Sequence, residues 1–144
     1  MTHEQKDLLL KDLCARLLYG VKLSFRCNHI HILKGIHESG LIVINNIVTN
    51  AITTTDAENT KPYLFPLSSM TEEQKYDFYC RFIESDYDFE DFKEHYLDSG
   101  MWRKLLTSLD DIEAIIDWFH KNHLDWRGLI PSELAIDATG LNIY

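Results

Sequence analysis

The spacing of apolar residues changes twice along the chain, and these changes limit the folds that it can adopt. Leu9, Leu13 and Leu17 recur at helical intervals. Over residues 21–49, apolar and polar side chains largely alternate, which is typical of half-buried strands. After residue 67 the helical spacing returns. A helix, then strands, then a group of helices predicts an α+β fold.

The first fifty residues predict an N-terminal helix packed on a small antiparallel sheet of three or four strands. Thr2 and Gln5 have the spacing of a capping box at the start of this helix. Asp12 is expected to face water. The inward stripe is expected to consist of Leu9, Leu10, Leu13, Cys14 and Leu17. Strands are expected over residues 21–27, 29–33, 41–44 and 47–49, with a tight turn at Asn45 and Asn46 before the last one.

The rest of the chain predicts a loop and then an acidic half of three or four helices. Residues 51–66 are polar and then contain two prolines, so we expect a long surface loop with an extended end. Two overlapping capping boxes, Ser69 with Glu72 and Thr71 with Gln74, predict a helix that ends near residue 83. A last long helix is expected over 109–123, capped by residue 107 or 108, and a short one from Pro131. The inward residues of the two long helices are expected to be Tyr76, Tyr79, Cys80, Ile83, Ile112, Ile115, Ile116 and Phe119.

Length and charge narrow the class of protein. A chain of 144 residues fits a single domain, with a sheet-bearing part over about 1–50, the loop over 51–66 and the helical part over 67–144. The net charge is −9, divided into +2 over residues 1–50 and −11 over residues 51–144. This negative net charge argues against direct DNA or RNA binding. It leaves open an acidic anti-defence protein that mimics nucleic acid.

The sequence has no signal peptide and no membrane-spanning segment, which predicts a cytoplasmic protein. Cys14, Cys27 and Cys80 are scattered without a CxxC pair, so we expect buried thiols in a reducing compartment. Neither a glycine-rich phosphate loop nor a catalytic motif is present, and we expect no cofactor.

The histidines are the weak candidates for metal binding or hydrolysis. His29 and His31 share one face of a predicted strand, and His120 and His123 share one face of a predicted helix. If the helix end lay near the sheet, these four side chains could bind zinc. A small metal- or histidine-dependent hydrolase is therefore a further alternative, although no motif favours it.

A cluster of aromatic residues and arginine suggests a binding surface. Trp126, Arg127 and Gly128 lie in the predicted tail, and Tyr63 and Lys61 lie in the extended segment. Trp and Arg are the side chains that most often carry interface energy. The alternative is that the two tryptophans, Trp118 and Trp126, fill the core and that Arg127 pairs with a nearby acid.

Three stretches of the sequence resemble a known family. They are QKDLLLKDLCARL at 5–17 with YGV at 19–21, KPYL at 61–64 with PLSSMTEE at 66–73, and DWFHKNH at 117–123 with DWRGLIP at 125–131. They are similar to a family of small uncharacterised proteins encoded by phages, prophages and mobile elements of gut Bacteroidales. Family members often have Pro in place of Leu18 and Tyr in place of Trp126. The resemblance implies an accessory protein of a phage or mobile element in the host bacterial cell, and it implies no catalytic residues.

The sequence as a whole favours a non-enzymatic binding protein. Its partner is expected to be a host protein or a small signalling molecule, held at the surface around Trp126 and Arg127. A homodimer is the default expectation, because most soluble oligomers are symmetric and dimeric.

Overall fold

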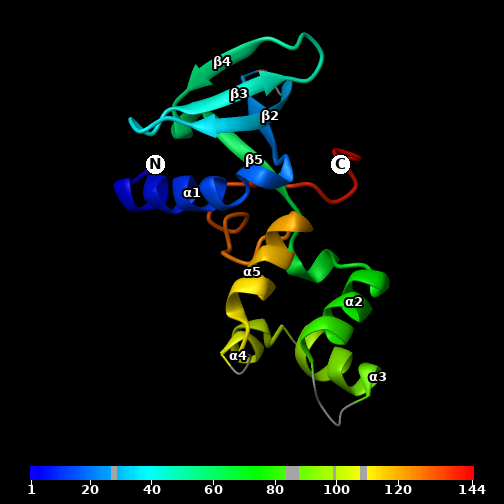
Figure 1. Cartoon of the computed structure of the whole chain (residues 1–144). Helices are drawn as coiled ribbons and strands as arrows, with labels where there is room; N and C mark the ends of the chain where they lie inside the picture. Colours follow the sequence, from blue (N-terminus) through cyan, green and yellow to red (C-terminus); the bar gives the residue numbers. More distant parts are fainter. Residues whose placement is uncertain (27–28, 84–87, 99, 108–109) are drawn as a thin grey trace.

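The computed structural model describes residues 1–26, 29–83, 88–98, 100–107 and 110–144, and it shows an α+β fold with a sheet part and a helical part (Figure 1). Its helices are α1 (His3–Ala15), α2 (Glu72–Phe82), α3 (Phe89–Phe92), α4 (Trp102–Leu106) and α5 (Ile112–Lys121). Its strands are β1 (Lys22–Phe25), β2 (His29–Ile36), β3 (Ile42–Asn46), β4 (Ile52–Thr55), β5 (Thr60–Leu64) and β6 (Ile136–Asp137). Short helical turns join them at η1 (Leu17–Tyr19), η2 (Ala57–Asn59), η3 (Leu67–Ser69) and η4 (Lys93–Asp98). None of the described helices is both long and apolar enough to cross a bilayer.

Helix α1 begins as predicted, but it presents a different face to the core. The Thr2 hydroxyl accepts the main-chain N–H of Gln5 at 3.2 Å, and the Gln5 side chain accepts the N–H of Thr2 at 2.8 Å. Asp12, expected to face water, is fully buried, because Arg16 one helical turn later is its ion-pair partner. Cys14, expected in the core, is exposed. The buried positions of this helix are Leu9, Asp12 and Leu13.

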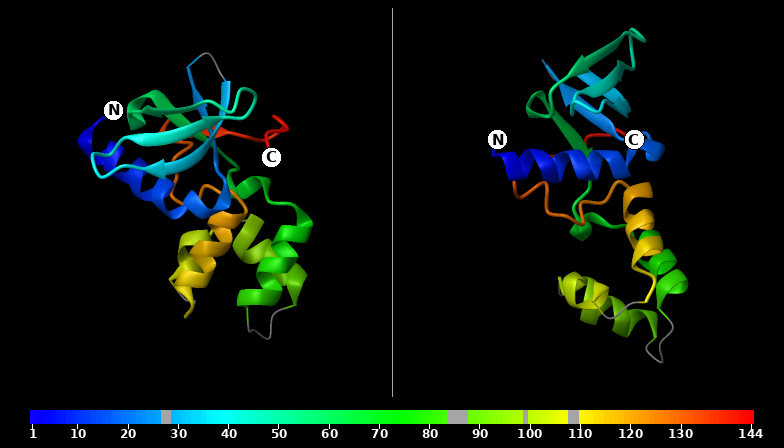
Figure 2. Two further views of the ribbon diagram at one scale, coloured as in Figure 1. Left: turned by 45° about the horizontal axis from the view of Figure 1, so that its top comes forward. Right: turned by 60° about the vertical axis from the view of Figure 1, so that its left-hand side comes forward.

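The sheet is larger than the three or four strands expected. In the described part of the chain it has six strands, in the order β4-β3-β2-β1-β5-β6. Neighbouring strands run antiparallel, except that β5 and β6 run parallel. Helix α1 lies between this sheet and the helical part (Figures 1 and 2). The predicted α+β class is confirmed.

The segment predicted to be the fourth strand is a turn. Strand β3 continues through Asn46, whose side-chain oxygen accepts the N–H groups of Val48 and Thr49 at 2.9 and 3.0 Å. An asparagine side chain that accepts in this way stabilises a turn, so the next strand, β4, starts only at Ile52. The long loop expected over 51–66 therefore contains both β4 and β5.

Helix α2 uses the second of its two predicted capping boxes. The Thr71 hydroxyl accepts the N–H of Gln74 at 3.2 Å, and the Gln74 side chain accepts the N–H of Thr71 at 3.0 Å. The residue that this helix buries fully is Phe78. Tyr76 is 55% exposed and Cys80 is exposed, so the inward face predicted for them is wrong. Cys27 lies outside the described residues.

Helix α5 starts later than predicted because a different residue caps it. The Asp111 carboxylate accepts the N–H of Ala114 at 3.1 Å, in the position expected for residue 107 or 108; residue 108 lies outside the described part of the chain. Ile112, predicted inward, is 49% exposed. The buried residues of α5 are Ile115, Trp118, Phe119 and His120.

The chain passes between the two parts at one point. Phe65 and Leu124 form a parallel β-bridge, in which the Phe65 N–H donates to the His123 carbonyl at 2.9 Å and the Asp125 N–H donates to the Phe65 carbonyl at 2.8 Å. Residues 66–123 thus leave and re-enter the sheet part at adjacent positions. They supply most of the apolar cluster around Phe78, which Phe65, Leu124 and Trp126 complete at the crossing point.

The tail after this crossing returns to the sheet instead of continuing the helical part. The predicted short helix at Pro131 is absent from this described segment, which forms turns and then β6 beside β5. Leu129, Leu134 and Ala135 pack in the same cluster as Leu23 of the sheet. The core of the sheet part is therefore built from both ends of the chain.

Candidate functional site

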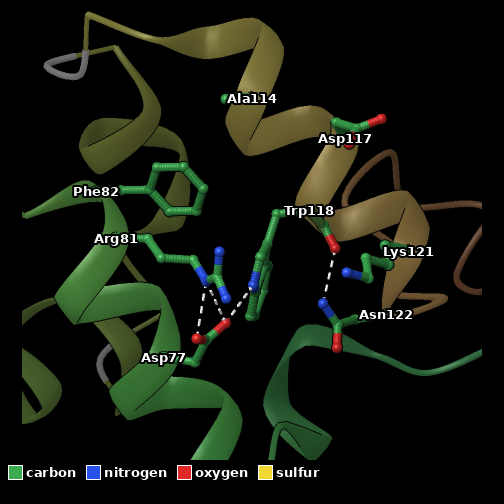
Figure 3. A pocket seen from close by; sticks show the side chains of 8 residues that line it. All are labelled: Asp77, Arg81, Phe82, Ala114, Asp117, Trp118, Lys121 and Asn122. Atoms are coloured by element: carbon green, nitrogen blue, oxygen red, sulfur yellow. Dashed lines mark hydrogen bonds and ion pairs between the residues drawn. The ribbon is translucent and has the colours of Figure 1, made fainter.

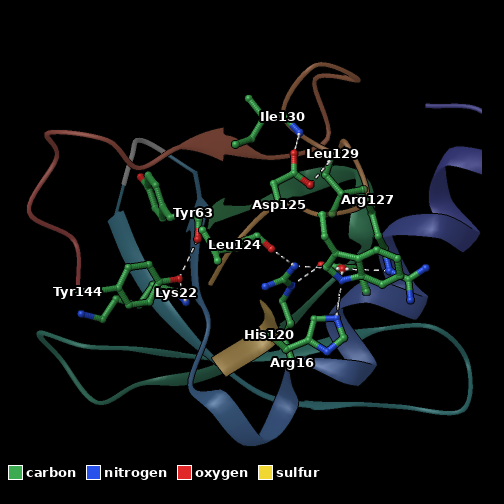
Figure 4. Close-up of polar contacts among 12 residues, drawn as sticks. Arg16, Lys22, Tyr63, His120, Leu124, Asp125, Arg127, Leu129, Ile130 and Tyr144 are labelled. Atoms are coloured by element: carbon green, nitrogen blue, oxygen red, sulfur yellow. Dashed lines mark hydrogen bonds and ion pairs between the residues drawn. The ribbon is translucent and has the colours of Figure 1, made fainter. Parts of the chain in front are cut away.

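A buried ion pair links α1 to the crossing point. Asp12 and Arg16 are both 0% exposed, and the Arg16 Nε lies 2.6 Å from the Asp12 Oδ2. The Arg16 Nη2 lies 3.3 Å from the other carboxylate oxygen and donates to the Leu124 carbonyl at 2.8 Å (Figure 4). Because buried charges are stable only when they are paired and hydrogen-bonded, this arginine fixes α1 against the residue at which the chain re-enters the sheet part.

Trp126 and Arg127, the predicted binding pair, lie against this ion pair. The indole Nε1 of Trp126 donates to the Nε2 of His120 at 3.1 Å. The guanidinium of Arg127 lies 4.3 Å from the centre of the Trp126 ring, and its Nε lies 3.3 Å from the Asp12 Oδ1. The Arg127 side chain is 26% exposed. These contacts give both residues an internal, structural role.

His120 is held neutral in this cluster. Burial lowers its pKa to about 4, and the nearby Arg16 charge acts in the same direction, while Asp12 opposes it. The Nε2 that accepts the Trp126 N–H is therefore the unprotonated nitrogen. A neutral imidazole suits this position, because Arg16 already compensates the charge of Asp12.

The other residues predicted to bind are spread along the sheet part. Tyr63 is buried in β5, and its carbonyl accepts the Tyr144 hydroxyl at 2.8 Å. Lys61 is exposed in the same strand, and Gly128 occupies a turn with a φ of 76°. Tyr63 and Arg127 lie on opposite sides of Leu124 (Figure 4). The structure therefore does not gather these residues into one surface.

The histidines considered for metal binding have other contacts. His31 is buried, with its Nδ1 3.0 Å from the His29 carbonyl and its Nε2 3.4 Å from the Asn46 amide nitrogen. His123 stacks on the Tyr144 ring, with the two ring centres 3.8 Å apart. Among the described residues, no group of three or more His, Cys, Asp or Glu side chains is placed to hold a metal ion.

A pocket of about 580 Å³ lies between α2 and α5 (Figure 3). It was not predicted from the sequence. Its volume falls within the range of small-molecule sites. The residues that line it are Asp77, Arg81, Phe82, Ala114, Asp117, Trp118, Lys121 and Asn122.

Asp77 organises one wall of this pocket. Its carboxylate accepts the Trp118 indole N–H at 2.8 Å and the Arg81 Nε–H at 2.8 Å, and these contacts, the first above all, lower the pKa of Asp77. The Nε–H of Arg81 is thus already donated to Asp77. In the described part of the chain, its two terminal nitrogens and the Lys121 ammonium have no further hydrogen-bond partner, although the charge of Lys121 also lowers the pKa of Asp77.

Asp117 forms the opposite wall and connects it to the sheet part. Its carboxylate accepts the hydroxyl proton of Tyr19, from η1, and this hydrogen bond raises the pKa of Tyr19. The charged residues of the lining are therefore two acids and two bases. Asp77 and Asp117 each already accept a hydrogen bond, whereas Arg81 and Lys121 keep N–H groups that can donate to a ligand. The described lining contains no Ser, Thr, Cys or His.

Several acids of the helical part serve its own helices. Glu72 forms ion pairs with Lys75 and Lys93, at 3.0 and 3.1 Å, and these contacts lower its pKa. Asp88 accepts the N–H of Asp91 at 3.0 Å and so caps α3. These side chains neutralise helix N-termini and neighbouring lysines.

Comparison with known proteins finds no matching family model, no similar curated protein and no similar solved structure.

Proposed function

We propose that this chain is a non-enzymatic binding protein of a phage or mobile element, acting in the cytoplasm of the host bacterial cell. Its ligand is a small molecule that enters the pocket between α2 and α5. The observation that carries this proposal is the pair of basic side chains, Arg81 and Lys121, that line one pocket together with the aromatic rings of Phe82 and Trp118.

The lining specifies the chemistry of the ligand. Arg81 and Lys121 supply donors suited to a carboxylate or phosphate oxygen. Phe82 and Trp118 suit a flat apolar group. Because Asp77 and Asp117 balance the two basic charges, a ligand with a single negative charge fits better than a polyanion.

The other functions predicted from the sequence have less support. A nucleic-acid mimic needs acids that are free to meet a basic target, whereas Glu72, Asp77, Asp88 and Asp111 have local partners. A histidine-dependent hydrolase needs histidines that meet around a reacting group, and His31 and His120 lie in separate hydrogen-bonded sites. Capture of a host protein stays a prediction, to be separated from ligand binding by experiment.

The test is a titration with indole-3-carboxylate, a flat molecule with one carboxylate, followed by two-dimensional NMR. We expect the largest shifts at the amides of Ala114, Lys121 and Asn122. Arg81→Gln and Lys121→Gln should each weaken binding by about tenfold, the value of one charge-assisted hydrogen bond. Lys34→Gln, which removes an exposed charge from β2, is the matched control and should leave binding unchanged.

A second probe, indole-3-methanol, tests the need for the charge, because it keeps the ring system and lacks the carboxylate. It should bind more weakly than the acid. Equal binding of both probes, or equal binding to all the variants, would contradict the proposed site. Capture of a host protein by a chain whose pocket binds neither probe would also contradict it.

A further inference from the structure

Strand β4 forms one edge of the sheet, and its outward main-chain groups have no neighbouring strand among the described residues. The Asn46 N–H donates to the Ala51 carbonyl at 3.0 Å, and Ile44 is opposite Thr53 in the same ladder. Because hydrogen-bonded and non-bonded pairs alternate between antiparallel strands, Ala51 and Thr53 point their main-chain groups toward β3. Ile52 and Thr54 therefore point theirs away from the sheet.

This edge is short, but it lacks the charges and the proline with which proteins often block strand pairing. Exposed edge strands commonly carry charges or proline, or are very short or covered. Residues 41–55 contain no Lys, Arg, Asp, Glu, Pro or Gly. Ile52 is 70% exposed, and Val48 in the preceding turn is 85% exposed. The opposite edge differs, because β6 spans only Ile136–Asp137 and ends on a charged residue.

We propose that β4 pairs antiparallel with β4 of a second copy of this chain, so that the two sheets become continuous. In the register that uses all the outward groups, Thr53 lies on the two-fold axis, and Ile52 of one copy faces Thr54 of the other. Each such pair exchanges both main-chain hydrogen bonds. Such an interface is isologous and therefore closes as a dimer.

The distribution of charge favours a second copy as the occupant. The β4 residues are uncharged, so a strand that meets itself encounters no like charge. Residues 51–144 carry a net charge of −11, and most of their acids belong to residues 66–123, whose helices lie at the other end of the molecule from β4 (Figure 1). Asp56, just beyond the strand, faces Asn50 of the second copy in this register. Pairing at β4 thus keeps the acidic helices of the two copies apart.

The strand is short, so the dimer is expected to be weak. Interfaces that bury less than about 1,200 Å² in total are typical of transient contacts. Sedimentation equilibrium over about 1 μM to about 1 mM protein should show the mass rising from 16.9 kDa toward twice that value. Thr54→Lys, which places a charge next to the two-fold axis and opposite Ile52 of the second copy, should hold the mass at the monomer value. Leu18→Lys is the control: it adds the same charge in η1, outside β4, at an apolar side chain that is 89% exposed, and the mass should still rise with concentration.

Amide hydrogen exchange locates the interface without any substitution. The amides of Ile52 and Thr54 should become protected as the protein concentration rises, whereas Thr53, already bonded to β3, should not change. A monomer at all concentrations overturns the proposal. So does a dimer that survives Thr54→Lys, or one that leaves the Ile52 and Thr54 amides unprotected, and so does a monomer that instead binds an extended peptide at β4.

Discussion

The ion pair of Asp12 and Arg16 makes a strong prediction about stability. In Asp12→Asn the side chain keeps its shape and can still accept a hydrogen bond, but its charge is lost. Arg16, which is 0% exposed, is then a buried cation without a counter-charge. Arg127, whose Nε lies 3.3 Å from the same carboxylate, adds a second positive charge nearby. Breaking a buried pair by removing one partner costs about 3–5 kcal/mol.

This cost is large compared with the total. Domains are usually stable by about 5–15 kcal/mol, and for a chain of about 150 residues each kcal/mol corresponds to about 2–4 °C in Tm. Asp12→Asn should therefore lower Tm by about 6–20 °C. Urea unfolding followed by far-ultraviolet circular dichroism measures the free energy of unfolding, with the slope against urea checked for constancy.

Two variants complete the experiment. Asp12→Leu combined with Arg16→Met removes both charges and should recover at least half of the loss, because an apolar pair of similar volume avoids the cost of desolvating the ions. Asp7→Asn, in the same helix, breaks only the exposed contact with His3 and should behave like the unaltered protein. The reasoning fails if Asp12→Asn costs less than about 1 kcal/mol, or if the double variant is no more stable than the single one.

Further predictions concern pH, a turn and a helix cap. Burial lowers the pKa of His120 from 6.5 to about 4, so the unfolded chain takes up a proton more readily; the contribution of His120 to stability, complete well above pH 6.5, should fall by about 2 kcal/mol at pH 5. His123, whose pKa burial also lowers to about 4, adds to the same slope. Urea titrations of His120→Gln should lack the His120 contribution, and an unchanged pH slope would contradict it. The Asp125 carboxylate accepts the N–H groups of Leu129 and Ile130 at 2.8 and 2.7 Å. Asp125→Ala should therefore cost about 2–3 kcal/mol and speed hydrogen exchange at both amides; slow exchange would refute this. Thr71→Ala should cost about 1 kcal/mol, whereas Thr71→Ser should retain the cap; equal losses in thermal unfolding would argue against capping.

The sequence predicted features that depend on one helical turn. The capping boxes of Thr2 with Gln5 and of Thr71 with Gln74 form where expected, because both partners belong to the same short segment. The change of apolar spacing also predicted the α+β class. Strand β4 was misplaced because its position depends on how the Asn46 side chain folds the turn, and the sequence pattern does not contain that choice.

The contacts of the two candidate sites are distant in sequence. Arg16 meets the carbonyl of residue 124, which is 108 positions away, and Asp77 meets Trp118, which is 41 positions away. No local pattern pairs such residues, although the i,i+4 spacing of Asp12 and Arg16 was a signal that could have been used. The cluster at Trp126 and Arg127 was noticed for its composition, but composition does not tell whether such residues face solvent or the core.

The crossing at Phe65 and Leu124 has a topological consequence. Because residues 66–123 leave and return at neighbouring points, the helical part has the connectivity of an insertion carried by a complete sheet unit. A linker of a few residues, such as Gly or Pro, would be enough to join Phe65 directly to Leu124. The proposed ligand pocket lies wholly within the insertion, and the proposed dimer edge lies wholly within its carrier. Mutations in the insertion should therefore change the proposed ligand without disturbing the proposed dimer. The Asp117–Tyr19 contact is one of the points at which the insertion and its carrier would remain coupled.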